Sequence, residues 1–313
     1  MSQDAKIVVA GSANMDLVFQ VERLPLGGET VRGGDLQLFP GGKGANQACA
    51  AGRLGGRVFM VAQVGQDAFG AKLIASLQEA GVDTARVGRS SRATGCASIY
   101  VLPDGENAIV ISPGANATLD VEAARSRLDL LDSGDYLLCQ LEIPLESVEA
   151  AFAAARSAGA VTVLDPAPAR ALPESLLRQT DILTPNQTEA ATLLGAPASR
   201  IETFQEAAAA AARLSEMGPS SVVIKMGGLG CYLRTPAFEG AVDSFQVAAV
   251  DSTAAGDVFN GALAVALAEG RGPAEAARIA CAAAAISVTR PGAQASIPLR
   301  QEVESFLATG RLN

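Results

Sequence analysis

The chain has 313 residues, a formal net charge of −9, 49% hydrophobic residues, five cysteines and no histidine. Without histidine, Ser-His-Asp and Cys-His catalysis and every histidine-ligated metal site are excluded. The acidic charge and the lack of a Lys/Arg cluster argue against a nucleic-acid binder, and widely spaced cysteines without a C-x-x-C pair predict reduced thiols in a cytoplasmic protein.

Strand-like and helix-like segments alternate along most of the chain. In chain order we expect a strand at 6–10, a helix at 44–54, a strand at 58–64, a helix at 69–80, a strand at 136–140, a helix at 145–158, strands at 161–164 and 181–183, helices at 188–194 and 204–217, a strand at 221–225 and a helix at 258–267. This order predicts a three-layer, Rossmann-like α/β fold with a mostly parallel sheet flanked by helices. Ligands in such sheets bind beyond the carboxyl ends of the strands.

Two segments depart from this alternation. Residues 16–39 alternate apolar and polar positions around Pro25-Leu26-Gly27-Gly28, and residues 95–112 resemble a hairpin closed by Pro103-Asp104-Gly105-Glu106. We expect both to form amphipathic antiparallel strands of a small β-sheet lid. No long linker, signal peptide or membrane-spanning run is apparent, so one domain over residues 1–313 is expected, with the lid inserted into it.

The strongest chemical signal is the run Asp-Ser-Thr-Ala-Ala-Gly-Asp at 251–257, which leads directly into a helical pattern. Small residues allow close approach to the backbone, and the free N–H groups at a helix start favour an anion. A carboxylate at this point, Asp257, suits a general base beside amides that stabilise developing negative charge. The alternative is that Asp257 only caps or flanks the helix.

Two glycine-rich stretches offer further candidates. Residues 40–46, Pro-Gly-Gly-Lys-Gly-Ala-Asn, do not form a Walker A loop, because Gly44 rather than Ser or Thr follows Lys43. Lys43 and Asn46 nevertheless supply donors next to glycines that permit close backbone approach. Residues 225–230, Lys-Met-Gly-Gly-Leu-Gly, begin where the predicted strand 221–225 ends and are suited to wrapping around a nucleotide. The competing interpretation of both stretches is a simple glycine turn.

Two polar stretches also follow predicted strands. In residues 11–16, Asn14 and Asp16 suit hydrogen bonds to sugar hydroxyls, with an Asx turn as the alternative. In residues 184–189, Asn186 and Glu189 suit positioning of metal-bound water near phosphates. A helix N-cap with Glu at the third helical position is the competing interpretation.

Over essentially its whole length the sequence resembles the ribokinase family of carbohydrate kinases. The resemblance is carried by Gly41–Asn46 and the 251–257 run in this order and spacing, together with Gly114-Ala-Asn-Ala117 and Asp165-Pro-Ala-Pro-Ala169. It implies phosphorylation of D-ribose at its 5-hydroxyl by ATP with Mg²⁺. Kinases for other sugars, such as deoxyribose or fructose, and a non-catalytic sugar-binding regulatory protein are the alternatives. Two departures are Lys225, where many relatives have Thr, and Asp165, where close relatives have Asn.

The resemblance also implies roles for individual residues. Those expected to hold the sugar are Asn14, Asp16, Gly42, Lys43, Asn46 and Glu142, with Asp257 as base and Ala254, Ala255 and Gly256 as anion hole. Those expected along the nucleotide are Asn186, Lys225, Gly227, Gly230, Gly256 and Cys281, with Asn186 and Glu189 affecting Mg²⁺. An activating K⁺ or similar monovalent cation would lie at Asp251, Thr253, Ser287, Arg290, Gly292 and Ser296. The family also implies a homodimer formed through the lid.

Overall fold

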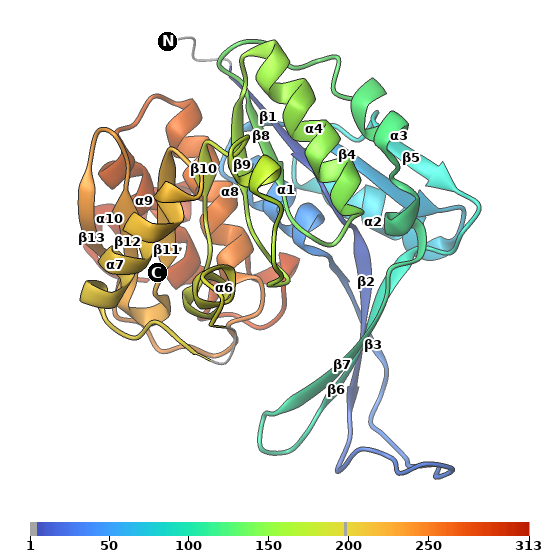
Figure 1. The fold of residues 1–313 in the computed structure, drawn as a ribbon. Coiled ribbons are helices and arrows are strands. Elements are labelled where there is room, and N and C mark those ends of the chain that lie inside the picture. The colour runs from blue at the N-terminus through green and yellow to red at the C-terminus, as the bar shows by residue number, and fades with distance from the viewer. Residues whose placement is uncertain (1–4, 197–198, 313) are drawn as a thin grey trace.

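The computed structural model describes residues 5–196 and 199–312 and contains two sheets (Figure 1). The larger sheet has nine strands in the order β13-β12-β11-β10-β9-β8-β1-β4-β5. Its parallel strands are β1 (Lys6–Ala10), β4 (Arg57–Gly65), β5 (Val87–Ser90), β8 (Tyr136–Cys139), β9 (Val161–Leu164), β10 (Ile182–Leu183) and β11 (Ser221–Lys225). Antiparallel β12 (Gly230–Arg234) and β13 (Glu239–Asp243) complete one edge. The predicted mostly parallel sheet is confirmed.

Helices cover both faces of this sheet. One face carries α1 (Lys43–Arg53), α2 (Ala68–Glu79), α8 (Ala255–Ala268), α9 (Pro273–Ser287) and α10 (Arg300–Thr309). The other carries α3 (Val121–Ser126), α4 (Leu145–Ala158), α5 (Glu174–Leu177), α6 (Gln187–Leu193) and α7 (Phe204–Glu216). Successive β1 side chains alternate between the two cores: Ile7 and Val9 pack on the first, Val8 on the second. This alternation explains why the strand reads as one continuous apolar run.

The second sheet is the lid, and it projects away from the helical layers (Figure 1). It has four strands in the order β3-β2-β6-β7: β2 (Asn14–Gln20), β3 (Gln37–Gly41), β6 (Gly95–Val101) and β7 (Asn107–Ser112). The β2–β3 and β6–β7 pairs are antiparallel, as expected, but β2 and β6 pair in parallel, so the sheet is mixed. The antiparallel strands expected within each segment are therefore confirmed, and the parallel pairing between the segments is an addition that local alternation could not specify.

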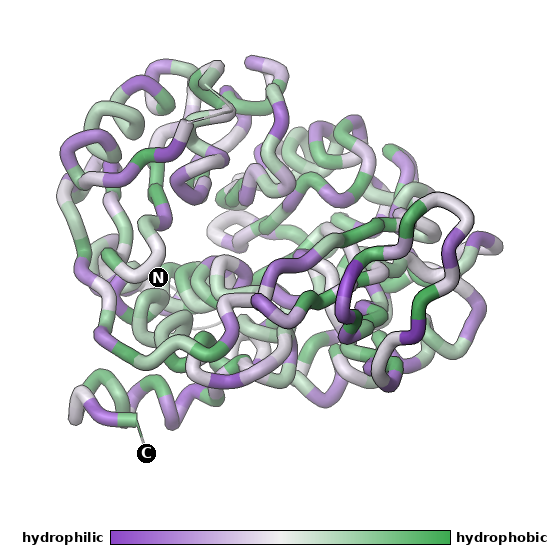
Figure 2. The backbone as a smooth tube through the Cα atoms, turned by 90° about the horizontal axis from the view of Figure 1, so that it is seen from below, coloured by the Kyte–Doolittle hydropathy of each residue, from purple (hydrophilic) through white to green (hydrophobic). Residues whose placement is uncertain are grey.

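The lid exposes apolar side chains. Ile109, Val110 and Ile111 are 50%, 65% and 53% exposed, and Figure 2 shows hydrophobic and hydrophilic stretches interleaved along the strands nearest the viewer. Within residues 5–196 and 199–312, no helix combines the length and hydrophobicity needed to cross a bilayer.

Candidate active site

Five strand ends meet at one edge of the large sheet and supply most of the site. Parallel pairing of β1, β8, β9, β10 and β11 brings their carboxyl ends together. The residues that follow these strands include Asn14, Glu142, Asp165 and Asn186, while Lys225 ends β11. Helices α1 and α8 begin at the same edge, so their N-terminal amides face these side chains.

The start of α1 depends on glycine. Gly42 is its N-cap at φ 88°, and a Cβ there would lie 2.7 Å from the Asn14 backbone nitrogen. A Cβ on Gly44 would lie 2.6 Å from the Ser12 nitrogen. This close approach places Glu142 at the helix start, where its Oε2 accepts from the Lys43 backbone N–H at 3.0 Å and from the Ser12 hydroxyl at 2.5 Å. The glycine stretch is therefore more than a turn: it brings α1 against the end of β1.

Asp257 lies in the first turn of α8 and is 5% exposed. Its Oδ2 accepts from Asn46 Nδ2 at 3.0 Å, and its Oδ1 accepts from Gln47 Nε2 at 3.1 Å. Burial, opposed by the charge of Lys43 and reinforced by that of Asp165, raises the pKa of Asp257 to about 6. Such a carboxylate is ionised near neutral pH yet basic enough to accept a proton. The two sequence signals at 41–46 and 251–257 thus meet in space.

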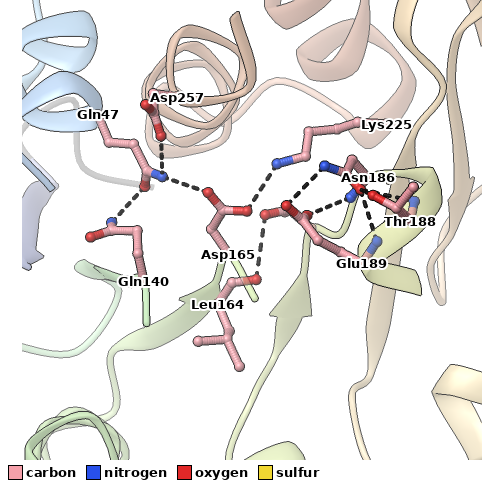
Figure 3. Close-up of polar contacts among 10 residues, drawn as sticks. Gln47, Gln140, Leu164, Asp165, Asn186, Thr188, Glu189, Lys225 and Asp257 are labelled. Carbon is pink, nitrogen blue, oxygen red and sulfur yellow. Dashed lines mark hydrogen bonds and ion pairs between the residues drawn. The ribbon is translucent and has the colours of Figure 1, made fainter. Parts of the chain in front are cut away.

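Sequence reasoning missed Gln47 and Gln140, which orient Asp257 together with the predicted Asn46. Gln47 Nε2 also donates to Asp165 Oδ2 at 2.9 Å, and Gln47 Oε1 accepts from Gln140 Nε2 at 2.7 Å (Figure 3). Since both ends of the amide are used, its orientation is fixed by its partners. A polar Gln47 inside an otherwise alanine-rich helix was the only available signal, and a buried glutamine at such a position requires hydrogen-bond partners.

The backbone before α8 leaves donors free. Ala254, the N-cap, adopts φ 60°, and it is the only non-glycine residue with positive φ in the described part of the chain. Within that part, the N–H groups of Ala254, Gly256 and Asp257 have no hydrogen-bond partner, whereas the Ala255 N–H donates to the Ser252 carbonyl at 3.2 Å. Free amides at a helix start, with no side-chain cap, are donors that favour an anion.

A cleft of about 470 Å³ opens in front of these amides. Its lining includes Lys43, Asp165, Asn186, Glu189, Lys225, Gly227 and residues 254–257. Asn186 and Glu189 form a capping box at the start of α6, with the Asn186 N–H donating to Glu189 Oε2 at 2.7 Å. The N-cap interpretation is therefore correct, and both side chains nevertheless line the cleft. Burial raises the pKa of Glu189, partly offset by Lys225.

The residues expected along a nucleotide line two adjoining hollows. A cavity of about 310 Å³ adjoins the cleft and shares Lys225, Gly227 and Gly256 with it; Gly230 and Cys281 lie in this second cavity. Among the described residues, no group of three or more acidic or cysteine side chains could hold a metal. Glu189 and Asn186 both line the cleft with oxygen atoms, the ligand type that Mg²⁺ prefers.

Asn14 and Asp16 lie at the junction of the large sheet and the lid. Asn14 Oδ1 accepts from Asn116 Nδ2 at 2.7 Å, and Asn116 Oδ1 accepts from the Ala13 N–H at 2.9 Å, so Asn116 fixes this turn. Burial, with the charges of Glu142 and Asp257, raises the pKa of Asp16 to about 7. No described residue donates a hydrogen bond to Asp16, so its oxygens are available to a hydroxyl.

Lys43 is the cation among these carboxylates. Burial alone would lower its pKa, but the charges of Asp257, Asp165, Glu142 and Glu189 hold the pKa of Lys43 above its ordinary value. The side chain therefore stays protonated and partly neutralises the acidic cleft.

The predicted cation loops do meet. Asp251 Oδ1 accepts from the Thr253 N–H at 2.9 Å, and Oδ2 accepts from the Gly292 N–H at 2.8 Å. Burial acts to raise the pKa of Asp251, but these hydrogen bonds lower it overall. The other predicted ligands have local partners: the Ser287 carbonyl accepts from Arg290 N–H, the Arg290 guanidinium pairs with Glu302, and the Ser296 hydroxyl donates to the Ala293 carbonyl.

Comparison with known proteins identifies the family of the chain. Residues 4–300 match the profile of the pfkB family carbohydrate kinases. A ribokinase from Haemophilus influenzae is 41% identical over 96% of this chain and 98% of its own length. The crystal structure of a Thermotoga maritima ribokinase has a TM-score of 0.87 and 40% identity, covering 97% of this chain and 100% of that one.

Two other relatives bear on the substrate. An Arabidopsis thaliana ribokinase structure, complexed with ribose and ATP, has a TM-score of 0.86 and 34% identity, covering 97% of this chain and 98% of that one. A deoxyribokinase from Salmonella typhi is 34% identical over 96% of this chain and 98% of its own length.

Proposed function

Since the chain belongs to the pfkB family of carbohydrate kinases, we propose that it transfers the terminal phosphoryl group of ATP to the 5-hydroxyl of D-ribose, giving ADP and D-ribose 5-phosphate. One observation carries the proposal: a buried carboxylate, Asp257, lies beside three unpartnered amides at the mouth of a cleft. A proton acceptor and an anion site at one point are what phosphoryl transfer to an alcohol requires.

Asp257 acts as the general base. As the sugar oxygen bonds to phosphorus and the bond from phosphorus to ADP breaks, the hydroxyl proton passes to a carboxylate oxygen. Asn46 and Gln47 aim that carboxylate, and a positioned base contributes about 10²–10⁴ in rate.

The amides of Ala254, Gly256 and Asp257 stabilise charge on the transferring phosphoryl group. Their dipoles are already oriented by α8, so no reorganisation is needed when charge develops. Ala255 was also expected in the anion hole, but its N–H donates to the Ser252 carbonyl, so we assign the hole to the amides of residues 254, 256 and 257. Mg²⁺ would neutralise phosphate charge when bound, held by Asn186 and Glu189 directly or through water.

The sugar lies between the two sheets. Asn14, Asp16, Lys43, Asn46 and Glu142 surround the junction with hydroxyl-binding groups, and the backbone of Gly42 lets the sugar approach α1 closely. Closure of the lid over the sugar would exclude water, which otherwise competes for the phosphoryl group. The nucleotide extends along Asn186, Lys225, Gly227 and Gly230 to the cavity at Cys281.

A monovalent cation, K⁺ or a similar ion, activates the enzyme at the Asp251 loop. The ionised Asp251 spans the loops before α8 and after α9, so an ion there would order the backbone that carries the anion hole. Carbonyl oxygens would be the main contribution of the other expected ligands, Thr253, Ser287, Arg290, Gly292 and Ser296.

We place the protein in the cytoplasm. Its five cysteines are all free thiols, and free thiols are typical of cytosolic proteins.

The lid forms a homodimer interface. Val18, Ile99 and Ile109 are cross-strand neighbours and make an apolar row on one face of the sheet. A second lid packed on this row would remove it from water.

A panel of sugars assayed with MgATP tests the proposal. D-Ribose should give the highest kcat/KM, and 31P NMR should place the phosphate on O5. No turnover of any sugar would contradict the kinase assignment, leaving a sugar-binding regulatory protein.

A deoxyribose kinase is the second candidate, favoured by the identity to the Salmonella typhi deoxyribokinase. It uses the same base and anion hole, so only the ratio of kcat/KM values for 2-deoxyribose and ribose separates it from the first.

A further inference from the structure

Lys225 is a buried cation with unused donors. Its Nζ lies 2.9 Å from Asp165 Oδ1, and the two side chains are only 12% and 3% exposed. An ammonium group has three N–H donors, and within the described chain Asp165 is the only acceptor for them. Lys225 therefore has donors available for an incoming acceptor.

The free donors lie next to the anion hole. Lys225 lines both the cleft and the adjoining cavity, and a Cβ on Gly256 would be 3.4 Å from Nζ. The Gly256 N–H is one of the unpartnered amides at the start of α8. A phosphate that accepts from these amides is thus within reach of the ammonium.

Asp165 connects this cation to the base. Its second oxygen accepts from Gln47 Nε2, which also donates to Asp257 (Figure 3). The chain Lys225–Asp165–Gln47–Asp257 therefore runs without a gap from the phosphate side of the cleft to the proton acceptor. Gln140 donates to Gln47 Oε1, so the Gln47 amide is oriented with Nε2 toward both carboxylates.

Lys225 lies along the nucleotide of the proposed function, and we propose that Asp165 is a positioning residue for it: Asp165 keeps the Lys225 ammonium directed at the terminal phosphates and holds Gln47 in register with Asp257. This rests on the proposed kinase function. Lys225 keeps its bond to Asp165 while its remaining N–H groups donate to phosphate oxygens. Asp165 does not touch the reacting atoms; it acts through its two partners.

The pair also balances charge around the base. The charged groups facing Asp257 are Lys43 from α1, Asp165 after β9 and Asp16 from β2. Without the Lys225 charge, the negative charge of the buried Asp165 is less compensated, and this raises the pKa of Asp257. Without the Asp165 charge, the pKa of Asp257 falls. The two substitutions therefore shift the acid limb of the pH profile in opposite directions.

The test compares Lys225→Met, Asp165→Asn and the double variant. Lys225→Met should lower kcat/KM for ATP by about 10- to 100-fold, the effect of losing a charged hydrogen bond, and move the acid limb of kcat by about one pH unit to higher pH. Asp165→Asn should move that limb to lower pH. The double variant should restore the limb toward wild type but keep the ATP defect.

Lys6→Met is the matched control. Lys6 pairs with Asp135 at 3.1 Å, and the two side chains are 13% and 6% exposed, but the pair lies at the opposite end of β1. This variant should lose stability without changing kcat/KM for ATP or the pH profile.

The outcomes are distinct. An inactive wild-type protein would contradict the kinase function itself. If the wild type is active and Lys225→Met has the same kcat/KM for ATP as Lys6→Met, the proposal is overturned. It is also overturned if the acid limbs of Lys225→Met and Asp165→Asn shift in the same direction. If Lys225→Met fails to fold, the double variant, which leaves no lone buried charge, decides the ATP effect.

Discussion

Gly42 gives the sharpest test of how the site is built. Replacing it with alanine forces a side chain into φ 88°, which costs about 1–2 kcal/mol. The new Cβ would also lie 2.7 Å from the Asn14 nitrogen and 3.0 Å from the Ala13 Cα. Both contacts are to backbone, so no rotamer change relieves them, and overpacking adds about 1–3 kcal/mol. Gly42→Ala should therefore lose about 2–5 kcal/mol of unfolding free energy in urea titrations.

Displacement of Asn14 should also impair the sugar site. We expect kcat/KM for ribose to fall by at least about tenfold, since small misplacements can cost about 100-fold. Gly28→Ala is the control, because Gly28 has φ 81° but nothing within 4 Å of an added Cβ. That variant should lose only the conformational part, about 1–2 kcal/mol, and keep its activity. Equal stability and unchanged kinetics in the two variants would refute the close-approach argument.

Three further predictions concern the base, the cation and the lid. Because only the carboxylate form of Asp257 accepts a proton and its pKa is about 6, kcat should fall about tenfold per unit as pH drops below that value; a flat profile from pH 5 to 8 would contradict this. Asp251→Ala should abolish the difference between rates measured in K⁺ and in tetramethylammonium at equal ionic strength, whereas persistent K⁺ activation would place the ion elsewhere. Ile109→Glu should convert a dimer to a monomer in sedimentation velocity at micromolar concentration, while Leu26→Glu, 75% exposed in the loop after β2, should not; a monomeric wild type would contradict the lid dimer.

The parallel core of the fold was predictable because each strand carries its own signal. Buried strands such as β1 and β11 are short β-branched runs, and their predicted bounds agree with the structure. The edge strand β13 has exposed positions at both ends and in the middle, so it lacks an apolar pattern and was missed. The parallel β2–β6 pairing joins residues 14–20 to 95–101, which no local pattern specifies.

The site was partly predictable for the same reason. Gly42 was predicted from the glycine spacing, because a close approach of two backbone segments requires glycine at particular positions. Asp257 was predicted from the 251–257 run, because a run of small residues before a helical pattern marks a helix start. Gln140 and Asn116 leave no such signal and Gln47 only a weak one, because their importance arises only when helix α1, the end of β8 and the turn at residue 13 come together. Long-range hydrogen bonds between buried amides depend on the tertiary fold.

The account depends most on the proton acceptor at the start of α8. The direct test is Asp257→Asn, with kcat measured in the coupled MgATP assay and ribose binding measured by calorimetry. We expect kcat to fall at least about 100-fold, the lower end for loss of a positioned base, while ribose still binds and the protein remains folded. Turnover within a few-fold of wild type would contradict the assignment of Asp257 as the base.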